Sequence, residues 1–175
     1  MLSELAQKLT LYKFLYDIDQ ELAEALKQKG CAYCDGRLHQ ANYTRKPRGG
    51  PEGVGDEFLK RRSFCCAVEG CRRRATPPSV LFMGRRVYWG AVVLLATTLL
   101  QGREHSMGKL QRTFGMVGKT LKRWLFYFHE EFPSRHAWQR LRGRVSSEVK
   151  NRNLPRDLLM LFMEELDEGG AAVAK

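Results

Sequence analysis

Cys31-Ala32-Tyr33-Cys34 and Cys66-Ala67-Val68-Glu69-Gly70-Cys71 are the two stretches that decide how this chain folds. The first is a C-x2-C pair and the second is a C-x4-C pair, and 31 residues separate them. A short pair of this kind makes a tight turn that directs two sulfurs at one ion, and four thiolates match a tetrahedral structural zinc site. The spacing therefore predicts a Zn²⁺ ion bound by Cys31, Cys34, Cys66 and Cys71.

Cys65 is the alternative to Cys66 as the third ligand. We favour Cys66 because alternate residues of an extended strand share a face, so that Phe64 packs under the site and Cys65 points away from it. His39 is a further candidate ligand. Buried free thiols are another interpretation of the cysteines. A catalytic zinc is disfavoured, since four sulfurs leave no open coordination position and the sequence has no H-E-x-x-H motif.

Outward from the cysteines, the sequence predicts an α+β fold that is mostly α. Leucines recur at helical steps in the segment that ends at Gly30. The cysteine segment that follows is rich in Gly, Pro and Arg, and amphipathic patterns come after it. Short strands are expected over 38–43 and 58–65, and a mobile, turn-rich loop over 47–55. The expected parts are an N-terminal amphipathic helix (1–30), a zinc ribbon (31–86), a helix-turn-helix domain (87–145), and a C-terminal helix with a tail (146–175).

The helix-turn-helix is predicted from the run KLQRTFGMVGKTLKRWL, residues 109–125. Leu110 and Phe114 share one face of a first helix, and Gly115 stands where the turn needs a residue that tolerates positive φ. Met116, Leu121 and Trp124 are expected to point into a small helical core. The residues expected to face outward, near the start of a recognition helix, are Gly118, Lys119, Lys122 and Arg123. An ordinary helical hairpin is the alternative.

The distribution of charge indicates a polyanionic partner. The net charge is +11, and residues 31–156 carry 25 Lys and Arg against nine acids, whereas both ends of the chain are slightly acidic. Nucleic acid is the usual partner of such a block. Arginines directly after the second cysteine pair suit backbone contacts, and a basic arm at 45–48 suits a minor groove. The predicted DNA-binding residues are Lys119, Thr120, Lys122, Arg123, Arg72, Arg73, Arg74, Arg45, Lys46 and Arg48.

This order of features resembles the DNA-binding region of insertion-sequence transposases with a zinc ribbon. The residues that carry the resemblance lie within 31–128: Cys31, Cys34, Cys66, Cys71, Arg72–Arg74, Trp89, Gly115, Thr120, Arg123 and Trp124. The resemblance implies DNA binding, and catalysis is not expected, since such transposases use three acidic residues of a following domain, whereas residues 71–155 here contain four Glu and no Asp. The C-x4-C spacing is wider than the C-x2-C that is usual in that family.

The function expected from the sequence is sequence-specific binding of double-stranded DNA, as a transposition accessory factor or transcriptional regulator of mobile-element type. The acidic helix expected over 154–168 is a candidate contact for a separately encoded transposase or a second copy of the chain. An RNA-binding or ribonucleoprotein role is the alternative, with Tyr33, Tyr43 and Phe58 as stacking residues. A nuclease using His105, His129 or His136 is disfavoured, and no enzymatic activity is expected.

Localisation is expected to be cytoplasmic and nucleoid-associated. No secretory signal is visible at the N-terminus. The most apolar stretch, residues 87–100, is too short to span a bilayer core of about 30 Å. No membrane partner is therefore expected.

Overall fold

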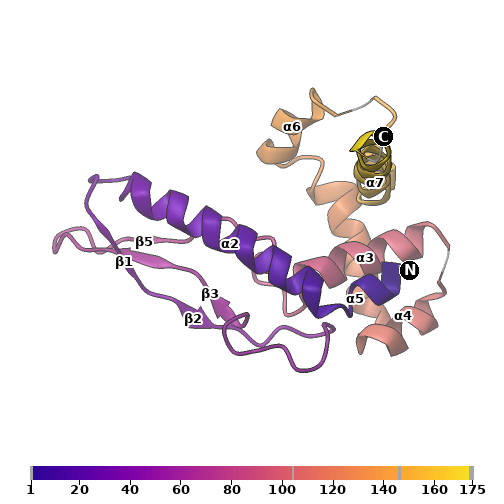
Figure 1. Ribbon diagram of the computed structural model, residues 1–175, viewed down its shortest axis with the longest axis horizontal. Coiled ribbons are helices and arrows are strands. Elements are labelled where there is room, and N and C mark those ends of the chain that lie inside the picture. The colour runs from indigo at the N-terminus through magenta and orange to yellow at the C-terminus, as the bar shows by residue number, and fades with distance from the viewer. Residues whose placement is uncertain (1, 104, 146, 174–175) are drawn as a thin grey trace. The chain divides into compact units, whose positions relative to one another are not determined.

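The computed structural model describes residues 2–103, 105–145 and 147–173, and the side chains of 4–103, 105–136, 138–145 and 147–164. It is an α+β protein in which helices are combined with two small antiparallel sheets (Figure 1). The chain divides into two compact units, Met1–Val92 and Val93–Lys175. Among the described residues, no helix combines the length and apolar character that crossing a membrane requires.

The first unit contains two helices, α1 (Leu2–Leu5) and α2 (Leu9–Lys29), and five short strands. A three-stranded antiparallel sheet has the order β1-β4-β5, and β2 pairs with β3 in a second sheet. The strand pairs meet as Leu38 with Cys66 in β1 and β4, and as Cys65 with Arg74 in β4 and β5. The strands are β1 (Leu38–Gln40), β2 (Tyr43–Thr44), β3 (Lys60–Arg61), β4 (Phe64–Cys66) and β5 (Arg74–Ala75).

The single N-terminal helix expected within residues 1–30 is interrupted between α1 and α2, and the buried face of α2 is not centred on the leucines. The fully buried positions of α2 are Tyr12, Asp19 and Ala23. Asp19 is buried because its two carboxylate oxygens accept hydrogen bonds from Ser79 Oγ, at 2.5 Å, and from the backbone N–H of Val80, at 2.7 Å. A carboxylate that is satisfied in this way tolerates burial that hydropathy alone would forbid.

Trp89 organises the other end of the first unit. Its ring stacks on Phe82, with centroids 5.5 Å apart, and meets Tyr12 edge-on at 5.0 Å. The backbone of Gly50 packs closely against the Trp89 ring, because a Cβ at Gly50 would come within 2.4 Å of Trp89 Nε1. The glycine-rich loop that the sequence predicted to be mobile is therefore packed at this point on the aromatic core.

The second unit is helical and contains a π-helix and a short 3-10 helix. α3 (Gly90–Gln101) contains the boundary between the units. Gln101 closes this region, because its amide contacts His129 Nε2 at 2.8 Å, donates to the carbonyl of Leu154 at 2.8 Å, and accepts from the N–H of Arg156. The remaining elements are α4 (Met107–Phe114), α5 (Gly118–Phe126), η1 (Tyr127–Glu131), α6 (His136–Arg142), η2 (Asn151–Asn153) and α7 (Arg156–Val173).

The acidic helix predicted over 154–168 corresponds to α7. Its side chains from residue 165 onward lie outside the described residues, as does the end of the predicted tail at 174–175. The proposed contact of this helix with a partner protein stays a prediction.

Candidate metal centre and candidate nucleic-acid interface

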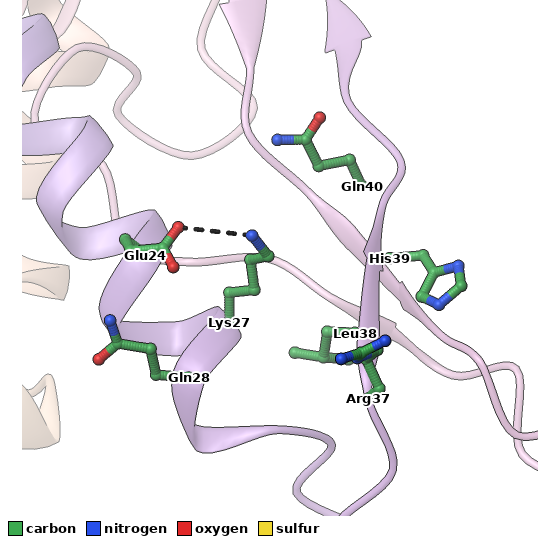
Figure 2. Close-up of a pocket in the computed structure, with 7 residues that line it drawn as sticks. All are labelled: Glu24, Lys27, Gln28, Arg37, Leu38, His39 and Gln40. Atoms are coloured by element: carbon green, nitrogen blue, oxygen red, sulfur yellow. Dashed lines mark ion pairs between the residues drawn. The ribbon is translucent and has the colours of Figure 1, made fainter.

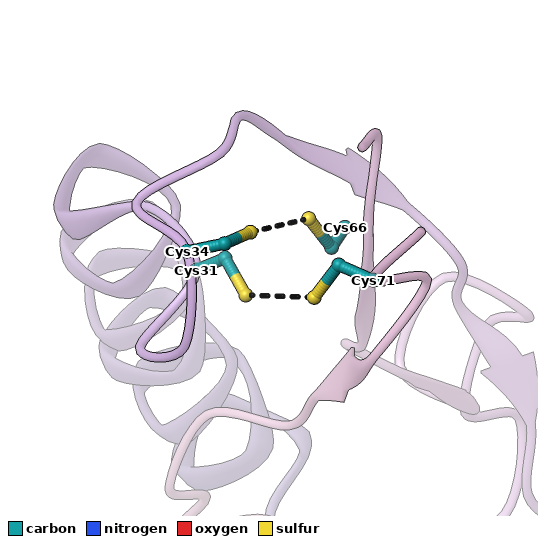
Figure 3. Close-up of side chains that lie close together, drawn as sticks. All are labelled: Cys31, Cys34, Cys66 and Cys71. Carbon is teal, nitrogen blue, oxygen red and sulfur yellow. Dashed lines mark hydrogen bonds between the residues drawn. The ribbon is translucent and has the colours of Figure 1, made fainter. Parts of the chain in front are cut away.

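Four cysteine sulfurs meet at one point in the first unit. The Sγ atoms of Cys31, Cys34, Cys66 and Cys71 all lie within 4.8 Å of one another (Figure 3). Cys31 and Cys71 are separated by 3.7 Å, and Cys34 and Cys66 by 3.5 Å. Bonds of about 2.3 Å from a tetrahedral ion place sulfurs roughly 3.8 Å apart, whereas a disulfide requires about 2.05 Å. The separation therefore fits a shared metal ion and excludes disulfides.

The first turn of this cluster is built by hydrogen bonds at residues 31–36. The N–H of Cys31 donates to the carbonyl of Gly36 at 2.9 Å, and the N–H of Asp35 donates to the carbonyl of Cys31 at 2.8 Å. Asp35, directly after the second cysteine, has a left-handed conformation with φ 54°. A Cβ at Gly36 would lie 3.1 Å from Cys66 Sγ and 3.3 Å from Cys34 Sγ. The nearest atom would be Val68 Cγ2, at 2.5 Å, so glycine at this position lets the second turn and its sulfur pack against the first.

The second turn repeats this geometry with one ligand moved. The N–H of Arg72 donates to the carbonyl of Val68 at 3.1 Å, as Asp35 does to Cys31, and Arg72 is also left-handed, with φ 47°. Val68 therefore occupies the position that Cys31 has in the first turn. The ligand is instead Cys66, two residues earlier in β4, and alternate residues of a strand share a face. The C-x4-C spacing is thus a C-x2-C-like turn whose first sulfur comes from a strand.

Cys65 and His39 lie outside the cluster. They are cross-strand partners in β1 and β4, whereas Leu38 pairs with Cys66. Figure 2 shows Leu38 on the α2 side of its strand and His39 on the opposite side. Cys65 Sγ contacts the carbonyl of Arg72 at 3.3 Å. The structure therefore gathers the four cysteines that were predicted, and the favoured Cys66 lies in the cluster while the alternative Cys65 does not.

The electrostatics of the cluster favour a bound cation. The N–H of Tyr33 is the main reason that the pKa of Cys31 is lowered to about 7, with burial acting against it. For Cys34, the N–H of Gly36 lowers the pKa, but the sulfurs of Cys66 and Cys71 raise it, to about 12 overall. Burial raises the pKa of Cys66. Four thiolates at these distances repel one another, and a divalent cation relieves that repulsion.

In the second unit, α4 and α5 are joined by a three-residue turn at residues 115–117. Ser106 caps α4 by accepting a hydrogen bond from the N–H of Lys109, and Gly115 ends it with φ 58° and ψ 40°. Gly118 does not face outward as expected, because a Cβ there would lie 3.0 Å from Met107 Sδ and close to Gln111. The start of α5 is thus held against α4. The residues predicted to form the small helical core are buried: Leu110, Phe114, Met116, Leu121 and Trp124.

The opposite face of α5 is positively charged. Lys119, Lys122 and Arg123 are exposed, while Thr120 is half-buried with its N–H bonded to the carbonyl of Val117. Residues 107–126 contain no Asp or Glu. Two exposed apolar residues of this pair were not predicted from the sequence. They are Val117, at the N-cap of α5, and Phe126, which is 59% exposed and lies seven positions after Lys119. The i+7 spacing is the signal that would have added Phe126 to this face.

The arginines after the second turn pair with tyrosines. The guanidinium of Arg73 lies 3.8 Å from the centroid of the Tyr33 ring, and that of Arg74 lies 5.9 Å from the centroid of Tyr43. Arg72, Arg73 and Arg74 are all exposed. Phe58, the third predicted stacking residue, is instead buried, with its ring 5.1 Å from that of Tyr16.

The predicted basic arm at residues 45–48 is held in place. Arg45 donates to the carbonyls of Gly84, at 3.2 Å, and Arg86, at 2.7 Å, and lies over the ring of Phe82. The N–H of Arg48 donates to the carbonyl of Val87, while the side chains of Arg48 and Lys46 are exposed. Arg45 therefore holds this segment against the protein, and the prediction of a mobile basic arm is corrected. The partners of Arg45 are distant in the sequence, so the sequence could not reveal them.

The predicted metal ligands and DNA-binding residues are thus divided between the two units. The four cysteines and Arg72–Arg74 belong to the first unit, together with the segment 45–48, and the α5 residues belong to the second. His129, a disfavoured catalytic candidate, is hydrogen-bonded to Gln101. No protein-family model, curated protein or solved structure matches this chain.

Proposed function

We propose that this chain is a sequence-specific binding protein for double-stranded DNA, and that α4 and α5 form a helix-turn-helix with α5 as the recognition helix. The observation that carries the proposal is the division of α5 into two faces. Leu121 and Trp124 are buried, whereas Lys119, Lys122 and Arg123 are exposed. A short rigid helix with a cationic outer face fits the major groove, where Lys and Arg bind guanine edges and phosphates.

The close approach of the two helices supports this assignment. A recognition helix must be held rigidly, and Gly118 lets the start of α5 contact α4 directly. The left-handed Gly115 gives the sharp turn between them. Residues 107–126 contain five Lys and Arg and no acid, and this balance of charge suits a phosphate backbone. An ordinary helical hairpin has no reason to keep acids from both helices.

The four cysteines are proposed to bind one structural Zn²⁺ ion. Their spacing, the sulfur separations and the glycine beside the sulfurs all suit a closed tetrahedral site. Four protein ligands leave no position for substrate, so the ion would stabilise residues 31–75, called here the cysteine module. The order of cysteine module and helix pair supports a role of mobile-element type, as a transposition accessory factor or a transcriptional regulator.

The decisive experiment is selection of bound sequences from a random duplex pool by the purified full chain at near-physiological salt. We expect an enriched motif that is lost in Lys119→Ala and Arg123→Ala. Lys13→Ala is the matched control, because Lys13 is an exposed lysine on α2 in the other unit. Each base contact contributes about 1–3 kcal/mol, so a single variant should weaken binding to the motif roughly 5- to 150-fold.

The outcomes separate the possible roles. A motif that matches element ends supports the accessory role, and one that matches promoters supports the regulator. Binding that fades with salt and enriches no motif would contradict the proposal, because contacts with phosphate alone carry no sequence information.

A further inference from the structure

The cysteine module carries two pairs of aromatic and guanidinium side chains that the duplex-binding helix does not use. Tyr33 lies between the first two cysteines and is 69% exposed, although the Arg73 guanidinium sits 3.8 Å from its ring centroid. An arginine covers only one face of a ring. The large exposed fraction therefore leaves the other face of Tyr33 open to solvent.

The second pair is Tyr43 and Arg74. Tyr43 is 39% exposed, and the guanidinium of Arg74 lies 5.9 Å from its centroid. Arg74 stands opposite Cys65, which in turn stands opposite His39, so these three positions form one row across the sheet. Directly opposite residues share a face. This is the face turned away from α2, as the side chain of His39 shows in Figure 2.

The charge of this region suits an anionic ligand. Arg72, Arg73 and Arg74 are consecutive and exposed, and the row of His39, Cys65 and Arg74 contains no acid. An exposed cation–π contact contributes only about 0.5–1 kcal/mol to stability. A purely structural role would thus gain little from leaving these two rings exposed with an arginine against each of them.

We propose that the cysteine module binds single-stranded nucleic acid, with bases stacking on Tyr33 and Tyr43 and the arginines contacting the phosphates. Stacking requires a base whose face is open, and the bases of an intact duplex are closed to side chains of this kind. The combination of exposed rings and a cationic surface is what sequence-tolerant single-strand binding uses. This ligand and this surface are additional to the duplex and to α5.

The test uses the zinc-loaded full chain and a fluorescein-labelled oligothymidylate strand, followed by fluorescence anisotropy. Oligothymidylate is chosen because stacking tolerates any base. Removing one stacking ring costs about 1–3 kcal/mol of binding free energy, so Tyr33→Ala should weaken strand binding roughly 5- to 150-fold. Tyr33→Phe should bind as the native chain does. Phe14→Ala is the matched control, because Phe14 is an aromatic residue of α2 that is 62% exposed and lies outside residues 31–75 in the sequence.

The duplex motif is measured in parallel, so that the two proposals fail separately. Tyr33→Ala should leave duplex binding unchanged, and Lys119→Ala should leave strand binding unchanged. Native-like strand affinity in a metal-loaded Tyr33→Ala chain overturns the proposal, as does an equal loss of strand and duplex binding. If Tyr33→Ala loses metal, Tyr43→Leu decides the matter by the same criteria. Strand binding without any duplex motif would refute the recognition helix alone.

Discussion

Cys65 and Cys66 are adjacent residues of one strand that should respond in opposite ways to the same substitution. Cys66 is fully buried with its sulfur in the cluster, whereas Cys65 is half-buried and its thiol donates to the carbonyl of Arg72. Cys66→Ser should abolish tetrahedral zinc binding. Cys65→Ser should retain one zinc per chain, because a serine hydroxyl can donate the same hydrogen bond.

The expected magnitude follows from how little else holds the cysteine module together. Its strands are two or three residues long, and Leu38 and Phe64 are the large apolar side chains fully buried beside the cysteines. These two side chains contribute about 3–6 kcal/mol by burial. A structural zinc ion contributes about 10–16 kcal/mol of apparent binding free energy. Loss of the ion should therefore unfold residues 31–75, whereas Cys65→Ser should change stability by less than about 1 kcal/mol.

The assay combines metal content by native mass spectrometry with hydrogen exchange resolved along the chain. For Cys66→Ser we expect no bound zinc and fast exchange of the β1, β4 and β5 amides, with α4 and α5 still protected. The reasoning is refuted if both serine variants keep zinc, if both lose it, or if a zinc-free chain retains slow exchange in these strands.

Three further substitutions test the packing around the sites. Gly115→Ala should destabilise the second unit by about 1–2 kcal/mol in urea unfolding, because φ is 58° and nothing within 4 Å of the added Cβ offsets the strain; an unchanged midpoint would contradict this. Asp19→Ala should lower the free energy of unfolding by about 3 kcal/mol, because two hydrogen bonds to its carboxylate are lost. Asp17 is exposed, so Asp17→Ala should change that free energy by less than about 0.5 kcal/mol. Equal effects of the two substitutions would contradict the role given to the buried Asp19. Gln101→Ala should lower the free energy of unfolding by about 1–3 kcal/mol and speed hydrogen exchange at the start of α7, because it removes contacts to Leu154, Arg156 and His129. Native-like protection of these amides would refute the role of Gln101.

The cysteine cluster was predictable because the relevant information is local. Two short pairs permit only tight turns, and strand alternation alone distinguishes Cys66 from Cys65. The two faces of α5 were predictable for the same reason, because Leu121 and Trp124 follow a helical period. The coarse α+β class followed from these two patterns, with small sheets beside helices.

The remaining features depend on contacts between distant residues. The buried face of α2 includes Asp19 because Ser79 and Val80, some 60 positions away, satisfy its carboxylate. Arg45 was assigned to DNA because nothing near it in sequence reveals the carbonyls of Gly84 and Arg86 that bind it. A hydropathy pattern shows how apolar each residue is, but it does not show which distant polar group will form a hydrogen bond with it.

The displacement of one sulfur from the turn into β4 joins two equilibria. Cys66 is both a candidate metal ligand and a paired strand residue, since it lies opposite Leu38 and its N–H donates to the carbonyl of Arg73. If the proposed ion is bound, metal occupancy and strand pairing would therefore rise and fall together. Linked equilibria are reciprocal. A ligand that binds only the paired sheet would therefore raise the affinity for metal by the same factor by which metal raises the affinity for that ligand. A cell's supply of metal would act on this chain as an effector of whatever the sheet binds.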